Sequence, residues 1–133
     1  CNRLDTLVIS SWNTGNVTDM EYMFGSCSAL AALDVSSLNT ENVTTMYGLF
    51  RGCSALTSLN LTGWNTENVT NMNYLFQGCS KLTTLDVSSL DTENVTDMSG
   101  MFSSCSSLNL PNAFLNIELT EQWGYAYGIG TIP

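Results

Sequence analysis

Residues 42–67, NVTTMYGLFRGCSALTSLNLTGWNTE, form one copy of a unit that recurs along the chain every 26 residues. Valine, methionine, phenylalanine and cysteine each keep a fixed place in this unit. The recurring positions are Val17, Val43, Val69, Val95; Met20, Met46, Met72, Met98; Phe24, Phe50, Phe76, Phe102; and Cys1, Cys27, Cys53, Cys79, Cys105. A fixed period of about 20 to 50 residues is typical of stacked repeats, none of which can bury its apolar face alone. The sequence therefore predicts a solenoid.

One part of each unit carries a leucine pattern that predicts a strand. Leu30, Leu33 and Val35 in one unit match Leu56, Leu59 and Leu61 in the next. Because apolar and polar residues alternate near the second and third apolar positions, we expect a short strand with one face inward. Repetition would stack these strands into a parallel sheet along one side of the solenoid.

The other part of each unit predicts a short helix. Val43, Met46, Phe50 and Cys53 lie at i, i+3, i+7 and i+10, which places them on one helical face. Side-chain oxygens of the asparagine and threonine residues at the start of this segment could cap its open N–H groups. These residues are Asn16, Asn42, Asn68, Asn94 and Thr18, Thr44, Thr70, Thr96. Gly52 and Gly78, just after the segment, favour a left-handed residue that ends the helix. Ser26 and Ser104 take the same place in other units.

The repeat divides the chain into two parts. Residues 1–108 hold four units and part of a fifth, whereas the register breaks after Leu108. A terminal repeat has no neighbour to cover its core, so we expect residues 109–133 to form an atypical C-terminal cap. Cys1 is already in register with the other cysteines, which indicates a piece of a longer, anchored chain.

Charge and hydropathy exclude several classes of partner. The net charge is −9, from 12 acidic residues against only three basic ones, Arg3, Arg51 and Lys81. Such a surface repels the phosphates of nucleic acid and has no basic stripe. No apolar run approaches the roughly 20 residues that span a bilayer, so we expect no transmembrane segment. The acidic balance favours solubility outside the cell or at its surface.

The five cysteines are predicted to form a buried thiol ladder. Their identical place in the unit sets them side by side in neighbouring repeats, at a separation that we expect to exceed the roughly 7 Å limit for a disulfide. Disulfides and a metal site are the alternatives. The chain has no histidine and no CxxC motif, so a zinc site is weakly supported and we expect no metal and no cofactor.

The unit also resembles a known family. LDVSSLDTENVTDMSGMFSSCSSL, residues 85–108, is similar to the 26-residue repeat of bacterial surface proteins, the BspA-like branch of the leucine-rich repeats, in its NVT-x-M-x-x-(M/L)-F-x-x-C pattern. The resemblance covers residues 1–108. It implies a right-handed α/β leucine-rich-repeat solenoid in a secreted or cell-surface bacterial protein with a role in adhesion. The asparagine falls one place later here than in the common leucine-rich form.

Side chains between the inward leucines are the candidate binding residues. On the open, concave face of the predicted sheet they form two rows of small, polar and mildly acidic side chains. The rows comprise Ala32, Ser58, Thr84 and Asp34, Asn60, Asp86. Such a surface could hold a protein or glycoprotein through hydrogen bonds, but a solvated sheet face often carries residues of this kind without binding anything.

A second acidic row consists of Glu41, Glu67 and Glu93 near the predicted helix starts. Like charges about 5 Å apart in water repel by roughly 0.8 kcal/mol. Helix N-terminal dipoles of about 0.3 to 1 kcal/mol each would offset this repulsion. The alternative is calcium bridging adjacent carboxylates.

Catalysis has little support in the sequence. The repeat places nearly all the acidic residues, and without histidine no nucleophile can be paired with an imidazole base. We therefore expect a non-catalytic surface or secreted module for adhesion or recognition of a protein or glycoprotein. The alternative is a passive spacer within a larger surface protein.

Overall fold

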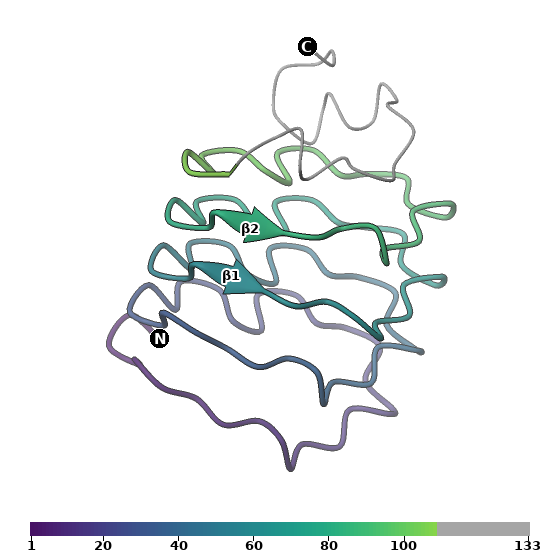
Figure 1. Cartoon of the computed structure of the whole chain (residues 1–133). Coiled ribbons are helices and arrows are strands. Elements are labelled where there is room, and N and C mark those ends of the chain that lie inside the picture. The colour runs from purple at the N-terminus through teal and green to yellow at the C-terminus, as the bar shows by residue number, and fades with distance from the viewer. Residues whose placement is uncertain (109–133) are drawn as a thin grey trace.

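The computed structural model describes residues 1–108, so the cap predicted for residues 109–133 lies outside the described part. The described residues form a stack that rises from the N-terminus, in which each 26-residue repeat makes one turn of the chain, called a coil below (Figure 1). Its regular strands are β1, Ser58–Leu59, and β2, Thr84–Leu85, which pair in parallel. Ser58 lies opposite Thr84, and Leu59 lies opposite Leu85. Because these partners are one repeat apart, the predicted period is confirmed, and so is the parallel strand side in these two coils.

The core is a column of apolar side chains that runs through the stack. Phe24, Phe50, Phe76 and Phe102 lie one above another, with successive ring centroids 5.6, 5.7 and 5.7 Å apart. Trp64, which follows β1, stacks on Phe50 with the two ring centroids 6.1 Å apart. The two sides of the coils therefore face each other across one shared core.

The prediction of a helix in each unit is wrong, because residues 1–108 contain no α-helix. In the predicted helical segment the amides of Met20, Tyr22 and Phe24 donate to carbonyls of the next coil, at 3.1, 3.0 and 3.0 Å. Parallel bridges connect the same places, Asp19 with Thr45, Thr45 with Asn71 and Asn71 with Asp97. An α-helix would direct these amides to its own carbonyls. Each coil therefore has a second ladder opposite the strand side, and the described part of the protein is not an α/β repeat.

Backbone conformation explains why no helix forms. Tyr22, Gly48, Tyr74 and Gly100 occupy one place in the repeat and have φ values of 52°, 59°, 56° and 63°. An α-helix needs φ near −60°, so a left-handed residue in mid-segment interrupts it. Consecutive tight turns take its place, with Met23 N–H donating to Met20 and Gly25 N–H to Tyr22. Gly48 and Gly100 inside the predicted helix were the sequence signal against it.

The left-handed residues predicted at the end of the segment are present. Ser26, Gly52, Gly78 and Ser104 have φ values of 58°, 78°, 77° and 60°. They close a turn, not a helix. The predicted left-handed conformation is therefore confirmed, but the prediction that it ends a helix is wrong.

The residues predicted as helix caps join neighbouring coils instead. The Nδ2 atoms of Asn42, Asn68 and Asn94 donate to main-chain carbonyls of the preceding coil, at 2.8, 2.9 and 2.7 Å. The hydroxyls of Thr44, Thr70 and Thr96 donate in the same direction, at 3.2, 3.3 and 3.2 Å. Without helices there are no helix ends to cap, and these side chains extend the ladder between coils.

The predicted buried thiol ladder is confirmed for four of the five cysteines and is wrong for Cys1. Cys27, Cys53, Cys79 and Cys105 are free and buried, whereas Cys1 is free and exposed. The Sγ atoms of Cys53, Cys79 and Cys105 donate to the carbonyls of Phe24, Phe50 and Phe76, at 3.1, 3.2 and 3.0 Å. Burial raises the pKa of Cys53 and of Cys105 to about 11. These cysteines are neutral core residues at physiological pH.

Candidate functional site

The structure gathers the six predicted binding residues on the strand side of the stack. All six are exposed, and they alternate with buried leucine and valine residues in each coil. They form two rows with one residue per coil, and the pairing of Ser58 with Thr84 fixes the register of the first row. The rows are Ala32, Ser58, Thr84 and Asp34, Asn60, Asp86. Their geometry is as expected, and their role in binding stays a prediction.

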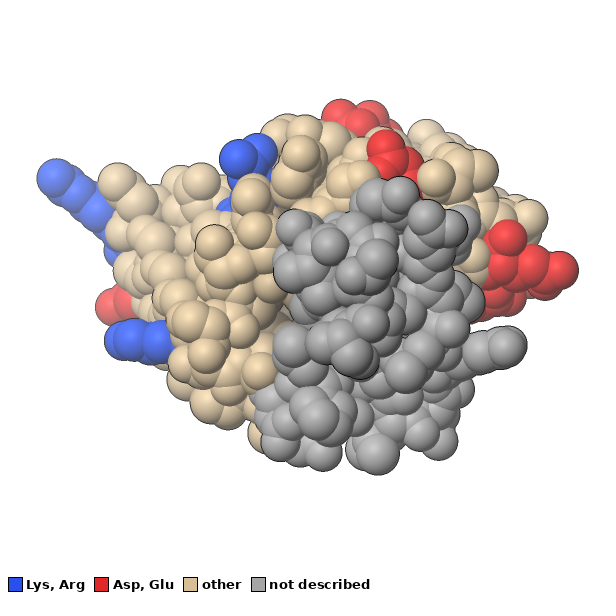
Figure 2. Space-filling model, turned by 90° about the horizontal axis from the view of Figure 1, so that it is seen from above, with Lys and Arg blue, Asp and Glu red and all other residues tan. Residues whose placement is uncertain are grey.

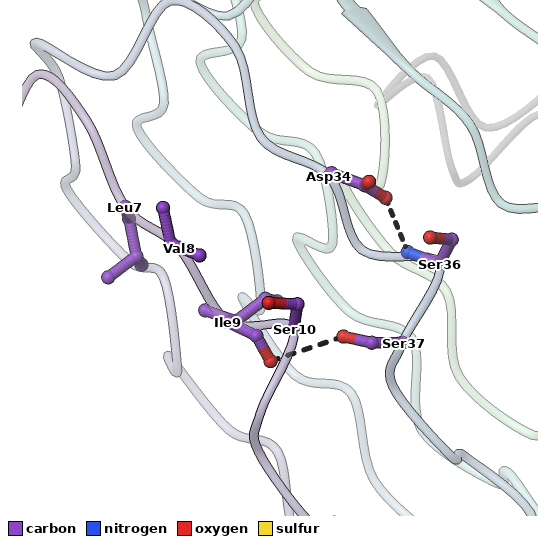
Figure 3. A pocket seen from close by; sticks show the side chains of 7 residues that line it. All are labelled: Leu7, Val8, Ile9, Ser10, Asp34, Ser36 and Ser37. Carbon is purple, nitrogen blue, oxygen red and sulfur yellow. Dashed lines mark hydrogen bonds between the residues drawn. The ribbon is translucent and has the colours of Figure 1, made fainter.

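Two neighbouring hollows lie on this face. One, of about 520 Å³, is lined by Ala32, Leu33, Asp34, Ser36, Ser58 and Asn60. The other, of about 320 Å³, is lined by Leu7, Val8, Ile9, Ser10, Asp34, Ser36 and Ser37 (Figure 3). Because both include Asp34 and Ser36, these two residues stand at the boundary between the hollows. Four of the six predicted residues therefore line one hollow, while Thr84 and Asp86 continue the same rows in the next coil.

Val8 adds an apolar element that the predicted residue set missed. It occupies the place taken by Asp34, Asn60 and Asp86 in the later coils, and its side chain is 81% exposed. An apolar residue in an otherwise polar row was the sequence signal that could have identified it. On the strand face, the apolar side chain of Val8 therefore lies at the N-terminal end of the row, and the acidic side chain of Asp34 follows it in the next coil.

Tight local turns fix the carboxylates of this face. Ser36 N–H donates to Asp34 Oδ1 at 2.9 Å, and Ser88 N–H donates to Asp86 Oδ1 at 2.9 Å. The Ser36 hydroxyl and then its amide hold the pKa of Asp34 below its usual value, and Ser88 does the same for Asp86. No ion pair joins the residues of the described range, 1–108, so both carboxylates are charged and have no cationic partner there. They remain available to a ligand.

The helix-dipole explanation predicted for the acidic row of Glu41, Glu67 and Glu93 is wrong. Since there are no helices, helix dipoles cannot offset the repulsion between these residues. The main-chain amides of these three residues donate hydrogen bonds to the side-chain Oδ1 atoms of the residues two places earlier. The acceptors are Asn39, Asn65 and Asp91, at 3.0, 3.0 and 2.9 Å. Among residues 1–108, no group of three or more acidic or cysteine side chains is arranged to hold a metal ion.

The stacked coils and their inward leucines define the protein as a repeat solenoid. The chain belongs to the family described as "Mycoplasma protein of unknown function, DUF285", whose model matches residues 1–60 and 27–125. No curated protein matches the sequence. In the described part of the chain, no helix has the length and apolar character needed to cross a membrane.

Two solved structures are similar to parts of the stack. A leucine-rich cell-surface protein of Faecalibacterium prausnitzii is 25% identical, with a TM-score of 0.47 over 80% of this chain and 25% of that protein. A leucine-rich repeat protein of Bacteroides ovatus is 22% identical, with a TM-score of 0.35 over 66% of this chain and 26% of that protein. The chain thus spans about a quarter of the length of either protein.

Proposed function

We propose that the protein is a non-catalytic recognition module at the cell surface or outside the cell, and that its strand face binds a protein or glycoprotein. One observation carries this proposal. The strand face holds carboxylates without an ion-pair partner among residues 1–108, at Asp34 and Asp86, and an apolar side chain at Val8, above a buried apolar core. The sequence resemblance to bacterial surface repeats supports the location, and a longer anchored chain would present the face.

The chemistry of the face indicates what it would select. Ionised Asp34 and Asp86 suit a lysine or arginine side chain of the partner, because a charged hydrogen bond is about twice as strong as a neutral one. Val8 suits an apolar side chain next to that cation. The turn formed by Ser36 holds the Asp34 carboxylate before binding, so little ordering is needed when a partner arrives.

A matched pair of charge reversals tests the proposal. Asp34→Lys with Asp86→Lys alters the strand face, whereas Glu41→Lys with Glu67→Lys makes the same change in net charge elsewhere. Binding to solubilised cell-surface glycoproteins should fall at least tenfold in the first variant only. Equal loss in both would indicate general charge steering instead of a local site. Unchanged binding in both would contradict the strand-face site, and absence of binding by the parent protein would favour the spacer.

A further inference from the structure

Three tyrosines and an arginine form a cluster on the second ladder, opposite the strands. Tyr22, Tyr47 and Tyr74 come from successive coils, with ring centroids 5.2 and 5.5 Å apart and interplanar angles of 67° and 76°. Arg51 Nη1 donates to the Tyr22 hydroxyl at 3.1 Å, and its Cζ lies 5.3 Å from the centroid of the Tyr74 ring. These four residues are called the tyrosine–arginine cluster below.

Backbone strain singles out two of its members. Tyr22 and Tyr74 have φ values of 52° and 56° at a place where Gly48 and Gly100 stand in the alternate coils. A bulky residue is strained in this conformation, and such strain is concentrated at functional sites. Each ring lies over the glycine of the next coil, since a Cβ built on Gly48 would be 2.7 Å from Tyr22 Cε1. Tyr22 remains 46% exposed despite the strain.

Charge is the second unusual feature of the cluster. Arg51 is exposed and has no ion pair within residues 1–108, although the chain carries 12 acidic residues. In the view of Figure 2, the lysine and arginine atoms lie toward one side, and most of the visible acidic atoms lie away from them. The contacts with Tyr22 and Tyr74 order the guanidinium while leaving it without a counterion. An anionic ligand would supply the missing charge.

Three main-chain amides beside the cluster already have partners within the stack. The amides of Tyr22, Gly48 and Tyr74 already donate to carbonyls of the following coil, at 3.0, 2.8 and 3.0 Å. The groups that the cluster presents to a ligand are therefore mainly its side chains. The cluster provides ring surface, hydroxyl groups and one cation. A sugar matches them with an apolar C–H face, hydroxyl groups and a carboxylate.

We propose that the tyrosine–arginine cluster binds an anionic sugar, with the sugar ring on Tyr22 and its carboxylate or sulfate at Arg51. This site is separate from the strand face. Hydroxyl groups of Tyr22 and Tyr47 contact sugar hydroxyls, and Tyr74 holds the guanidinium from below. An acidic peptide is the competing ligand, and it is an arm of the test.

Calorimetric titration of the whole chain tests this site. The probes are tetragalacturonate, sialyllactose and a sulfated disaccharide, with maltotetraose and lactose as neutral sugars and tetraglutamate as the peptide. At least one anionic sugar should bind at least tenfold more tightly than both neutral sugars and tetraglutamate. Failure of every anionic sugar to bind at about 10 mM would overturn the proposal, and so would equal or tighter binding of tetraglutamate.

Variants locate the site and keep the protein folded. Arg51→Gln and Tyr22→Gly should each weaken binding at least tenfold, and Tyr22→Gly places at this position the residue found in the adjacent coil. Lys81→Gln removes an equal charge outside the cluster and should leave affinity unchanged, as should Asp34→Lys with Asp86→Lys on the strand face. Equal loss in Lys81→Gln, or unchanged affinity in Arg51→Gln and Tyr22→Gly with folding intact, would reject the cluster as the site.

Discussion

Thr40 and Asn65 exchange two hydrogen bonds between adjacent coils. The Thr40 hydroxyl donates to the carbonyl of Asn65 at 2.9 Å and accepts from the Asn65 amide at 2.9 Å. Thr40 is only 2% exposed, so both main-chain groups of Asn65 depend on this single hydroxyl. Thr14 makes the same pair with Asn39, and Thr66 makes it with Asp91. A buried threonine at the corner therefore connects each coil to the next.

Thr40→Val should destabilise the protein by about 2 kcal/mol, although valine has almost the same shape and is more apolar. The loss arises because the part-buried amide and carbonyl of Asn65 both lose their hydrogen-bond partner. Urea unfolding followed by circular dichroism measures it. Thr44→Val removes one hydroxyl bond at an exposed place and should cost less than about 1 kcal/mol. Equal costs would show that the corner threonine has no special role.

One thiol should react quickly with a thiol reagent in the native protein, and four should react slowly. Cys1 is exposed, whereas the other cysteines are buried, and burial raises the pKa of Cys53 to about 11. Because the thiolate is the reactive form, these cysteines are protected by both access and ionisation. Absorbance during labelling gives the two phases, and unfolding in urea should merge them. A second fast thiol under native conditions would contradict the buried ladder.

Met72→Asp should be among the most damaging single changes. Met72 is fully buried in an inner coil, with coils packed on both sides, so the variant places an unpaired carboxylate in the core. We expect a loss of more than about 3 kcal/mol and unfolding of more than one coil, since neighbouring repeats support each other. Thr57→Asp, at an exposed place, is the control. A melting temperature close to that of the parent would reject the core position.

Gly48→Ala should destabilise the protein for two separable reasons. The residue has φ +59°, which alanine disfavours, and its new Cβ would lie 2.7 Å from Tyr22. Gly63→Ala isolates the first reason, because Gly63 has φ +87° and nothing lies within 4 Å of its Cβ position. Gly48→Ala should therefore cost more than Gly63→Ala by about 1 kcal/mol or more. Adding Tyr22→Gly should recover that difference, and additive costs would exclude the clash.

The Asp34 carboxyl should titrate below the value of about 3.9 found in unfolded chains. Hydrogen bonds from Ser36 stabilise the ionised form, so this contribution is complete above the unfolded pKa and is lost as pH falls through the lower, folded pKa. Carboxyl carbon shifts between about pH 2 and 6 measure the midpoint. Ser36→Ala should raise the pKa of Asp34 and leave that of Asp86 unchanged. A pKa of about 3.9 or higher for Asp34 in the parent protein would contradict stabilisation of its ionised form by Ser36.

The sequence was sufficient for the repeat and the strand face because both depend on which side chains recur. Leu59 and Leu85 are buried and Ser58 and Thr84 are exposed, as strand alternation requires. The helix was wrong because the apolar spacing from Val43 to Cys53 fits consecutive turns as well as a helix. Hydrogen bonds from these amides to the next coil select the consecutive turns over the helix, and such bonds cannot be predicted from the spacing of apolar residues.

The candidate sites were predictable to different degrees. Asp34 and Asn60 follow from strand alternation alone, whereas the tyrosine–arginine cluster depends on the turns that replace the helix. Tyr22 and Tyr74 come into contact with Tyr47 from different places in the repeat. Their alternation with Gly48 and Gly100 was visible in the sequence, but its meaning requires the left-handed backbone.

The ladders between coils set a rule for how the gene could change length. Hydrogen bonds such as those from Thr44 to Thr18 and from Thr70 to Thr44 connect residues one repeat apart. Duplication or deletion of 26 codons inside the array would restore every such bond at the new junction. Loss of a single codon would displace the main-chain ladder, the threonine corner and the phenylalanine column together. Variation in length among related genes should therefore occur in whole coils.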